Sequence, residues 1–292
     1  MNKIKCCFIG DIQLNSLEKY ICSTTKYQSK FEHTTYTCPS WNVRKNEIGS
    51  KRLFYVENDH ICTNSPLMKR QFAKSSGIES GSIQTGIYDV FVLVGPPVRY
   101  WRTLWQNIKS FSLPEPLCDE GSVFKPIPEQ AFQDALINTM KQHNHNLLSL
   151  IRQTHPKAKI MVIPEPMLSE NVLANPPSEN VQQFLSHVEA RQTQYLIGLL
   201  ETTAQAWLKA HFNAELILQP ETTLNPRNLL TRKKFEISIP DDQPSSYLIM
   251  NDKYNKLIMD ALIGNITEKA EARSQKIKAK RKKRRAKKKT TV

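Results

Sequence analysis

Five short apolar runs rich in β-forming residues alternate with longer segments whose apolar positions recur at helical spacing. The runs are Ile4–Ile9, Arg52–Val56, Tyr88–Val94, Lys159–Ile163 and Glu215–Leu218. The third run is almost continuously apolar, as expected for a central parallel strand that is covered on both faces. Strands that alternate with helices predict a three-layer α/β/α fold around a doubly wound, flavodoxin-like, five-stranded parallel sheet.

The apolar stripes predict three principal helices. The first begins near Pro128, a favourable residue for a first helical turn, and its stripe runs as far as Ile151. The second is capped by Ser178 and its stripe continues to Leu208, and the third starts near Asn251. The proline-bearing segment 109–129 has weak periodicity and is interpreted as a long excursion near the ligand-binding edge of the sheet.

Ligands of doubly wound folds bind beyond the carboxyl ends of the strands. At that edge the sequence places the turn after the first strand, the residues after the third strand and those after the fourth. The residues that we predict to bind a ligand there or at the start of the last helix are Asp11, Gln13, Asn15, Gly95, Arg99, Glu165 and Asn251.

The turn after the first strand carries the most informative residue of the chain. A Gly-Asp pair that follows a strand and opens a helix is where many α/β hydrolytic enzymes place a nucleophile, and Gly10-Asp11 is such a pair. The next residue is Ile12, which has no hydroxyl or thiol and therefore cannot attack a substrate. Asp11 itself is expected to cap the following helix, with an acid–base role as the alternative.

A second group of candidates follows the third strand. Arg99, Tyr100, Trp101, Arg102 and Trp105 could form a pocket of cations and aromatic rings for a sugar or a phosphate. The alternative is an ordinary helix with mixed packing, whose arginine side chains reach along apolar surface to water.

Several motifs, taken in order, resemble those of the SGNH (GDSL-type) hydrolase superfamily, in particular a bacterial branch associated with surface polysaccharides. The similarity spans about residues 3–264, and each motif alone is weak. The motifs are Gly10-Asp11-Ile12-Gln13-Leu14-Asn15, Tyr88–Gly95, Val162–Glu170, Gln219–Leu224, Thr231-Arg232 and Ser246–Tyr254.

The resemblance implies a serine nucleophile, a histidine base and an orienting aspartate. The matching positions here hold Ile12, Ile249 and Ser246, and Pro97 stands where an asparagine of the oxyanion hole is expected near Gly95. Since such residues act as a unit, the comparison favours a catalytically degenerate protein. Its expected role is binding or scaffolding, with a groove for a carbohydrate or acyl ligand. The alternative is an active ester hydrolase or O-acyltransferase with rearranged catalytic residues.

The positive charge of the chain is concentrated at its end. The net charge is +14, and the residues from Glu268 onward hold 13 of the 41 Lys and Arg but 2 of the 27 Asp and Glu. We therefore expect a hydrolase-like domain over residues 1–266 and a polybasic extension over 267–292 that is disordered or partly helical. The basic run at its centre is Lys280, Arg281, Lys282, Lys283, Arg284 and Arg285.

Clustered Lys and Arg without aromatic residues predict sequence-independent binding of a polyanion, such as nucleic acid, anionic polysaccharide or an acidic membrane surface. A nuclear import signal and a solubilising extension are the alternatives.

No cofactor is expected, because the sequence contains no recognisable cofactor motif. The six cysteines include no C-x-x-C pair and no histidine cluster has metal-ligand spacing, so no metal site is expected either. No apolar run approaches the roughly 20 residues of a membrane helix, and the N-terminal apolar stretch is too short for a secretion signal. These features predict a protein of the cytoplasm with no transmembrane segment.

Overall fold

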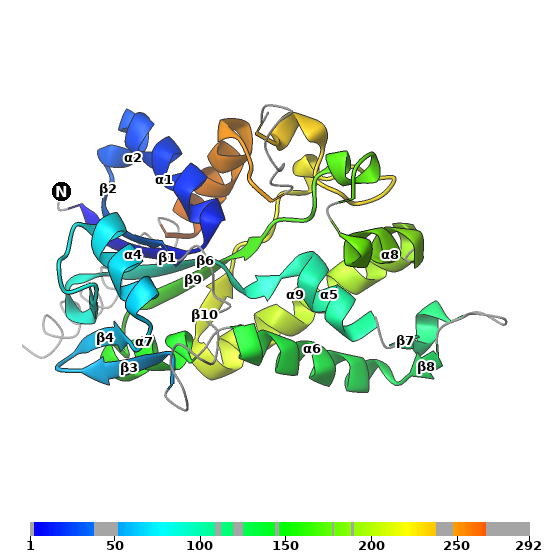
Figure 1. Ribbon diagram of the computed structural model, residues 1–292, viewed down its shortest axis with the longest axis horizontal. Coiled ribbons are helices and arrows are strands. Elements are labelled where there is room, and N and C mark those ends of the chain that lie inside the picture. Colours follow the sequence, from blue (N-terminus) through cyan, green and yellow to red (C-terminus); the bar gives the residue numbers. More distant parts are fainter. Residues whose placement is uncertain are drawn as a thin grey trace, which may run out of the picture.

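The computed structural model describes residues 3–37, 52–108, 112–118, 125–143, 146–176, 178–187, 190–237 and 248–266. Its centre is a five-stranded parallel sheet with the strand order β10-β9-β6-β1-β2 (Figure 1). These strands are β1 (Ile4–Gly10), β2 (Phe31–Thr37), β6 (Val90–Arg99), β9 (Lys159–Glu165) and β10 (Ala214–Leu216). Counted along the chain, this order is 2-1-3-4-5, which confirms the predicted flavodoxin-like arrangement.

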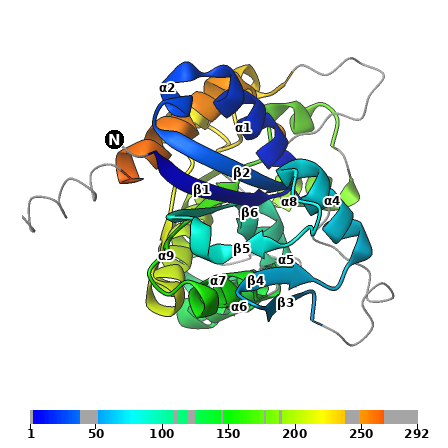
Figure 2. The ribbon, with the colours of Figure 1, turned by 90° about the vertical axis from the view of Figure 1, so that its left-hand side faces the viewer.

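Helices cover both faces of the sheet because its central strands are apolar on both faces (Figures 1 and 2). Val92 and Val94 of β6 pack with α1, α2 and a helix over residues 252–266, whereas Phe91 and Leu93 pack with helices of the other face. The helices of the first face are α1 (Ile12–Ser23), α2 (Thr25–Gln28) and the one over 252–266. Those of the other face are α4 (Pro66–Ser76), α5 (Tyr100–Ile108), α6 (Glu129–His143), α7 (Leu147–Thr154) and α9 (Ala190–Phe212).

Shorter elements complete the described part of the chain. A three-stranded antiparallel sheet contains β3, β4 and β5, and a two-stranded parallel ribbon contains β7 and β8. Their bounds are β3 (Phe54–Glu57), β4 (His60–Thr63), β5 (Ile83–Gln84), β7 (Ser112–Pro114) and β8 (Lys125–Ile127). The remaining helix is α8 (Glu179–His187), and 3₁₀ turns span Thr85–Ile87, Glu115–Leu117, Glu170–Leu173, Glu221–Thr223 and Lys233–Phe235. Within these residues, no helix is both long and apolar enough to span a bilayer.

The prediction for the second strand of the main sheet is wrong. The run Arg52–Val56 overlaps β3, which pairs antiparallel with β4 in the smaller sheet. The main sheet instead uses β2, whose sequence Phe-Glu-His-Thr-Thr-Tyr-Thr is polar at most positions. β2 is an edge strand that pairs only with β1, so it is covered less completely than the central strands, and its Glu32 is exposed.

Two predicted continuous helices are each divided. The stripe from Phe132 to Ile151 belongs to α6 and α7, and Asn146 between them has a φ of 67°, a left-handed conformation that interrupts a helix. The stripe after Ser178 is divided between α8 and α9, and residues 188–189 lie outside the described part. Continuous apolar spacing therefore did not reveal either interruption.

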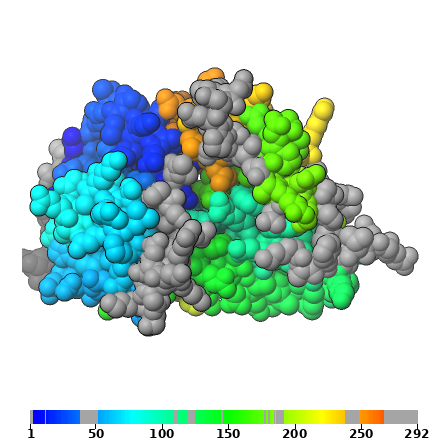
Figure 3. All heavy atoms as spheres, in the orientation of Figure 1, coloured from blue at the N-terminus to red at the C-terminus, as the bar shows by residue number. Residues whose placement is uncertain are grey.

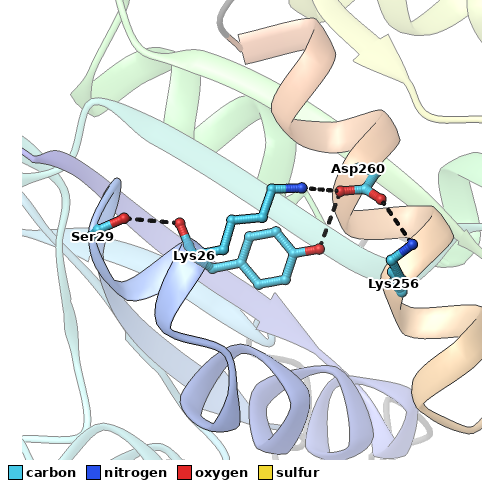
Figure 4. Close-up of polar contacts among 5 residues, drawn as sticks. Lys26, Ser29, Lys256 and Asp260 are labelled. Carbon is cyan, nitrogen blue, oxygen red and sulfur yellow. Dashed lines mark hydrogen bonds and ion pairs between the residues drawn. The ribbon is translucent and has the colours of Figure 1, made fainter.

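Polar contacts join the last helix, over residues 252–266, to the first crossover, which is the connection of α1 and α2 between β1 and β2 (Figure 4). Asp260 accepts hydrogen bonds from Lys26 Nζ at 2.9 Å and from the Tyr27 hydroxyl at 3.2 Å, and its other oxygen lies 4.0 Å from Lys256 Nζ. In the space-filling view the atoms of this last helix, in orange, lie next to the blue atoms of the first crossover (Figure 3). The contact therefore joins residues that are more than 230 positions apart.

We expect Asp260→Asn to lower the free energy of unfolding by about 0.5 kcal/mol at neutral pH, since exposed ion pairs contribute little. Burial alone would raise the pKa of Asp260, but the Lys26 and Tyr27 hydrogen bonds and Lys256 outweigh it and lower that pKa. A lowered folded-state pKa stabilises the fold above the unfolded-state pKa and loses this effect as pH falls through the folded-state value. Urea unfolding from pH 7 to pH 3 should therefore show the variant converging on the parent chain in acid. A constant difference at all pH values would contradict the ion-pair explanation, and Glu79→Gln, at an exposed position, is the control.

Candidate functional site

Three neighbouring strands bring charged residues to one edge of the sheet. Asp11 directly follows β1, Arg99 ends β6 and Glu165 ends β9, and these strands lie side by side in the order β1-β6-β9. The pairing of β6 with β9 is regular as far as Gly95, and an irregularity after it places Arg99 opposite Glu165. The structure therefore groups three of the predicted site residues at the carboxyl ends of the strands, where ligands bind in this fold.

Arg99 lies between two carboxylates. Its Nη2 is 3.7 Å from Asp11 Oδ2, and its Nε is 3.7 Å from Glu165 Oε2. A second arginine, Arg102, places its Nε 3.5 Å from Glu165 Oε1. We call Asp11, Arg99, Arg102 and Glu165 the charge cluster.

The charge cluster is largely buried and its ion pairs are loose. The side chains of Arg99 and Glu165 are 7% and 3% exposed, whereas that of Arg102 is 37% exposed. Arg99 Nε, Arg102 Nε and Glu165 Oε1 are buried and have no hydrogen-bond partner among the described residues. Since buried charged groups are normally hydrogen-bonded, these atoms have unused capacity to bind a polar group.

Burial controls the protonation of the two acids. It raises the pKa of Glu165 from its ordinary 4.5 to about 7; Arg99 and Arg102 oppose this rise, and Asp11 adds to it. Burial also raises the pKa of Asp11, opposed by Arg99, the Gln13 N–H and Arg102. Glu165 therefore changes its charge near neutral pH.

The turn at Asp11 depends on two glycines. A Cβ on Gly10 would lie 2.7 Å from the Val94 carbonyl oxygen, and one on Gly95 would lie 2.7 Å from Asp11 Oδ2. Gly95 also has a φ of +95°, which disfavours any side chain. The Asp11 carboxylate accepts a hydrogen bond from Gln13 N at 3.2 Å and so caps α1, as the sequence predicted.

The other predicted ligand-binding residues have different surroundings. Gln13 is buried and its Oε1 has no partner among the described residues, whereas Asn15 is exposed. Asn251 caps the last helix by accepting from Lys253 N and Tyr254 N, and its amide donates to the carbonyl oxygens of Lys234 and Glu236. Its polar atoms are therefore used within the fold.

The positions that match a catalytic triad are described only in part. Ile12 is the first residue of α1, and the Ile249 carbonyl accepts a hydrogen bond from Ile237 N. Ser246 and the basic run Lys280–Arg285 lie outside the described residues. That the side chains of Ile12 and Ile249 lie close together stays a prediction.

Sequence reasoning left Arg102 out of the ligand-binding set, although it named Arg102 among the residues after the third strand. The helix interpretation of that segment is confirmed, and the pocket for a sugar or a phosphate stays a prediction. Tyr100 to Ile108 forms an ordinary helix, α5, with Tyr100 buried in the core. Yet the Arg102 guanidinium lies 5.4 Å from the centre of the Trp101 ring and belongs to the charge cluster. The signal that could have identified it is its spacing of three residues from Arg99, which places both arginines on one side of the helix start.

A neutral network beside the charge cluster was also missed. Gln219 accepts from Met167 N at 2.8 Å and donates to the hydroxyls of Thr223 and Thr231, each at 3.0 Å. Thr231 in turn donates to the Met167 carbonyl at 2.6 Å. The motif residues after β9 and β10 therefore fix the conformation of these two loops.

Comparisons with known proteins give a remote likeness. No protein-family model matches the sequence, and no curated protein is similar to it. A GDSL-like lipase from Bacteroides thetaiotaomicron is 10% identical with a TM-score of 0.40, over 91% of this chain and 88% of its own. A putative platelet activating factor from Streptococcus pneumonia is 12% identical with a TM-score of 0.40, over 91% and 85%. An acetyl xylan esterase from Butyrivibrio proteoclasticus is 12% identical with a TM-score of 0.39, over 92% and 65%.

Each likeness is remote. Identities of 10–12% and TM-scores of 0.40 or lower bear on no question of activity, so the function must be argued from the residues of this chain.

We expect the raised pKa of Glu165 to make the fold less stable as pH rises. Between about 4.5 and about 7 the folded state holds a proton at Glu165 that the unfolded state releases, so the free energy of unfolding falls over this interval and is flat above it. The fall attributable to this residue is at most about 3 kcal/mol. In Glu165→Gln this part of the slope should disappear, as measured by urea unfolding at half-unit pH steps, while the exposed Glu79→Gln control keeps it. An unchanged slope in Glu165→Gln would show that Glu165 does not titrate in this range.

Proposed function

We propose that the protein is an SGNH hydrolase-like binding or scaffolding module that has lost ester cleavage. The observation that carries this proposal is the turn at the end of β1, where Ile12 follows the Gly10-Asp11 pair and offers no attacking atom. The nearby charge cluster supports it, since its carboxylates and arginines balance one another instead of forming a set of donors for an oxyanion.

The positions of the described histidine side chains also favour this function over a relocated triad. His33 contacts the Cys22 sulfur near the end of α1, and His60 lies in β4 of the smaller sheet. His143, His155 and His211 lie at or just after the ends of helices that run back toward the amino ends of the strands. These five side chains therefore lie away from the edge that carries Asp11.

The chemistry of the exposed part of the site supports a carbohydrate or acyl ligand. The part-exposed Arg102 guanidinium lies against the Trp101 ring. A planar cation beside an aromatic ring can hold a polar, ring-shaped ligand such as a sugar.

We expect the parent chain not to hydrolyse p-nitrophenyl acetate above the background rate. Restoring a triad with Ile12→Ser, Ser246→Asp and Ile249→His should also fail to give efficient hydrolysis, because Pro97 has no side-chain donor for the oxyanion. Removing one such donor raises the barrier by roughly 2.7–4 kcal/mol in characterised enzymes.

Two outcomes would overturn this proposal. Turnover by the parent chain that a Glu165→Gln substitution abolishes would show an active enzyme with rearranged residues. Family-like turnover by the triple variant would show that the rest of the site is intact. Circular dichroism of each variant guards against loss of the fold as the reason for inactivity.

We further propose that residues 267–292 form a separate polybasic extension that binds polyanions. The buried face of the last helix includes Ile258, Leu262 and Ile266, and the net charge from Glu268 to the end is +11. Positive charge in this segment can bind any dense polyanion, including nucleic acid, without sequence preference.

We expect truncation after Ile266 to abolish most binding to duplex DNA and to heparin while leaving thermal stability nearly unchanged. The net charge falls from +14 to about +3, and each lost phosphate contact removes about 0.9 from the slope of log affinity against log salt. Fluorescence anisotropy over a range of NaCl concentrations measures both quantities. Retained affinity would place the basic site on residues 1–266, and unfolding would show that the extension is packed.

A further inference from the structure

A groove of about 810 Å³ lies beside β10, the edge strand opposite β2. One wall is a single face of α9, and the other is the segment that follows β10, with a contribution from the last helix. The lining residues are Gln194, Ile197, Gly198 and Glu201 of α9; Leu218, Gln219, Pro220, Glu221, Leu224, Pro226, Leu229 and Arg232 of the segment; and Ala261. None of them belongs to the residues predicted to bind a ligand, so this is a second region of the molecule. Its volume is typical of small-molecule sites.

Gly198 is unexpected at its position. It lies well inside α9, a helix of 23 residues, where glycine is less favourable than alanine by about 1 kcal/mol. A Cβ added there meets no atom within 4 Å, so packing does not require glycine. The position instead faces the open groove, and the missing side chain widens it. Leu218, on the other wall, is 42% exposed although it is a large apolar residue.

The polar groups of the groove carry an excess of negative charge. The buried Tyr100 hydroxyl donates to Glu201 Oε1 at 2.5 Å, which fixes this carboxylate and leaves Oε2 available. Burial raises the pKa of Glu201, and the nearby charge of Glu221 raises it further against the Tyr100 hydrogen bond. Arg232 directs its Nε to the Leu224 carbonyl at 2.8 Å, so one of its donors is used within the wall.

We propose that this groove binds a small amphipathic amine, with its ammonium group between Glu201 and Glu221 and its apolar body over Gly198 and against Leu218. The ammonium group would relieve the repulsion between the two carboxylates. The apolar body would cover Leu218 and Ile197, which supplies the hydrophobic part of the affinity.

The test uses the full chain and three probes with one skeleton: 2-phenylethylamine, 3-phenylpropionate and 2-phenylethanol, each titrated by calorimetry. The amine should bind and the other two should bind more weakly. Each of the two part-exposed charge pairs contributes up to about 1 kcal/mol, which is a factor of up to about five. This order is diagnostic because the chain has a net charge of +14, so non-specific attraction would favour the carboxylate. Glu201→Gln and Glu221→Gln should each reduce the preference for the amine over the alcohol by a similar factor.

Gly198→Leu tests the place of binding. It fills the groove and should abolish amine binding, while the midpoint of thermal unfolding stays the same or rises by about 2 °C because leucine is the better helix former. The matched control is Gly264→Leu in the last helix. A Cβ there also meets no atom within 4 Å, and Gly264 does not line the groove. This control should bind the amine like the parent chain.

Three results would overturn the proposal. The first is no binding of the amine at millimolar concentration, and the second is amine binding that survives Gly198→Leu. The third is tighter binding of 3-phenylpropionate, which would assign the groove to an anion held by Arg232. Unfolding of Gly198→Leu would be seen in the same thermal measurement, and Gly198→Met, with a flexible side chain of similar volume, then gives the same comparison.

Discussion

The arrangement of the strand ends depends on the burial of Arg99 between Asp11 and Glu165. A buried guanidinium is strongly unfavourable without counter-charges, and removing one partner of a buried pair typically costs 3–5 kcal/mol. The two carboxylates come from the strands on either side of β6, so the requirement for charge balance holds three strand ends in one arrangement. The same contact explains Gly95, because any side chain there would meet the Asp11 carboxylate.

This constraint also limits the chemistry of the edge. In a hydrolase the turn after the first strand presents an attacking oxygen to a substrate and donors to the developing negative charge. Here Asp11 uses its carboxylate to cap α1 and to face Arg99, and the groups with unused capacity are atoms of Arg99, Arg102 and Glu165. None of these atoms is a hydroxyl or thiol at the start of α1, which is where the motif would place a nucleophile. Arg102 is the most exposed side chain of the charge cluster, and its guanidinium lies against the Trp101 ring.

Much of the fold could be predicted from apolar spacing, because the central strands are buried on both faces and leave a strong signal. Four of the five predicted runs overlap strands of the main sheet. The edge strand β2 gave a weak signal because its buried face includes the polar residues Thr35 and Thr37, and Glu32 is exposed. The break at Asn146 was missed for another reason, since the apolar residues of α6 and α7 stay in phase across it.

The site was harder to predict than the fold. Adjacent parallel strands necessarily bring Asp11, Arg99 and Glu165 to one edge, and this much follows from strand order alone. The spacing from Arg99 places Arg102 on the same side of the helix start. Whether its side chain turns inward depends on which acid faces it, and Glu165 lies 63 positions further along the chain. The groove beside β10 was not predicted, although one of its walls contains residues of the motifs Gln219–Leu224 and Thr231-Arg232. Its shape depends on the missing side chain of Gly198 and on the path of the chain after β10, which no motif reveals.

Two consecutive residues, Arg99 and Tyr100, connect the charge cluster with the wall of the groove. Arg99 ends β6 inside the charge cluster, and Tyr100 begins α5 with its hydroxyl on Glu201 in the wall of the groove. Both side chains are almost fully buried, so neither can move without disturbing its neighbours. Tyr100 shares its backbone with Arg99, so a shift of the Tyr100 hydroxyl in the groove wall would have to be taken up by the packing around Arg99. Arg99 in turn faces carboxylates at the ends of the two neighbouring strands.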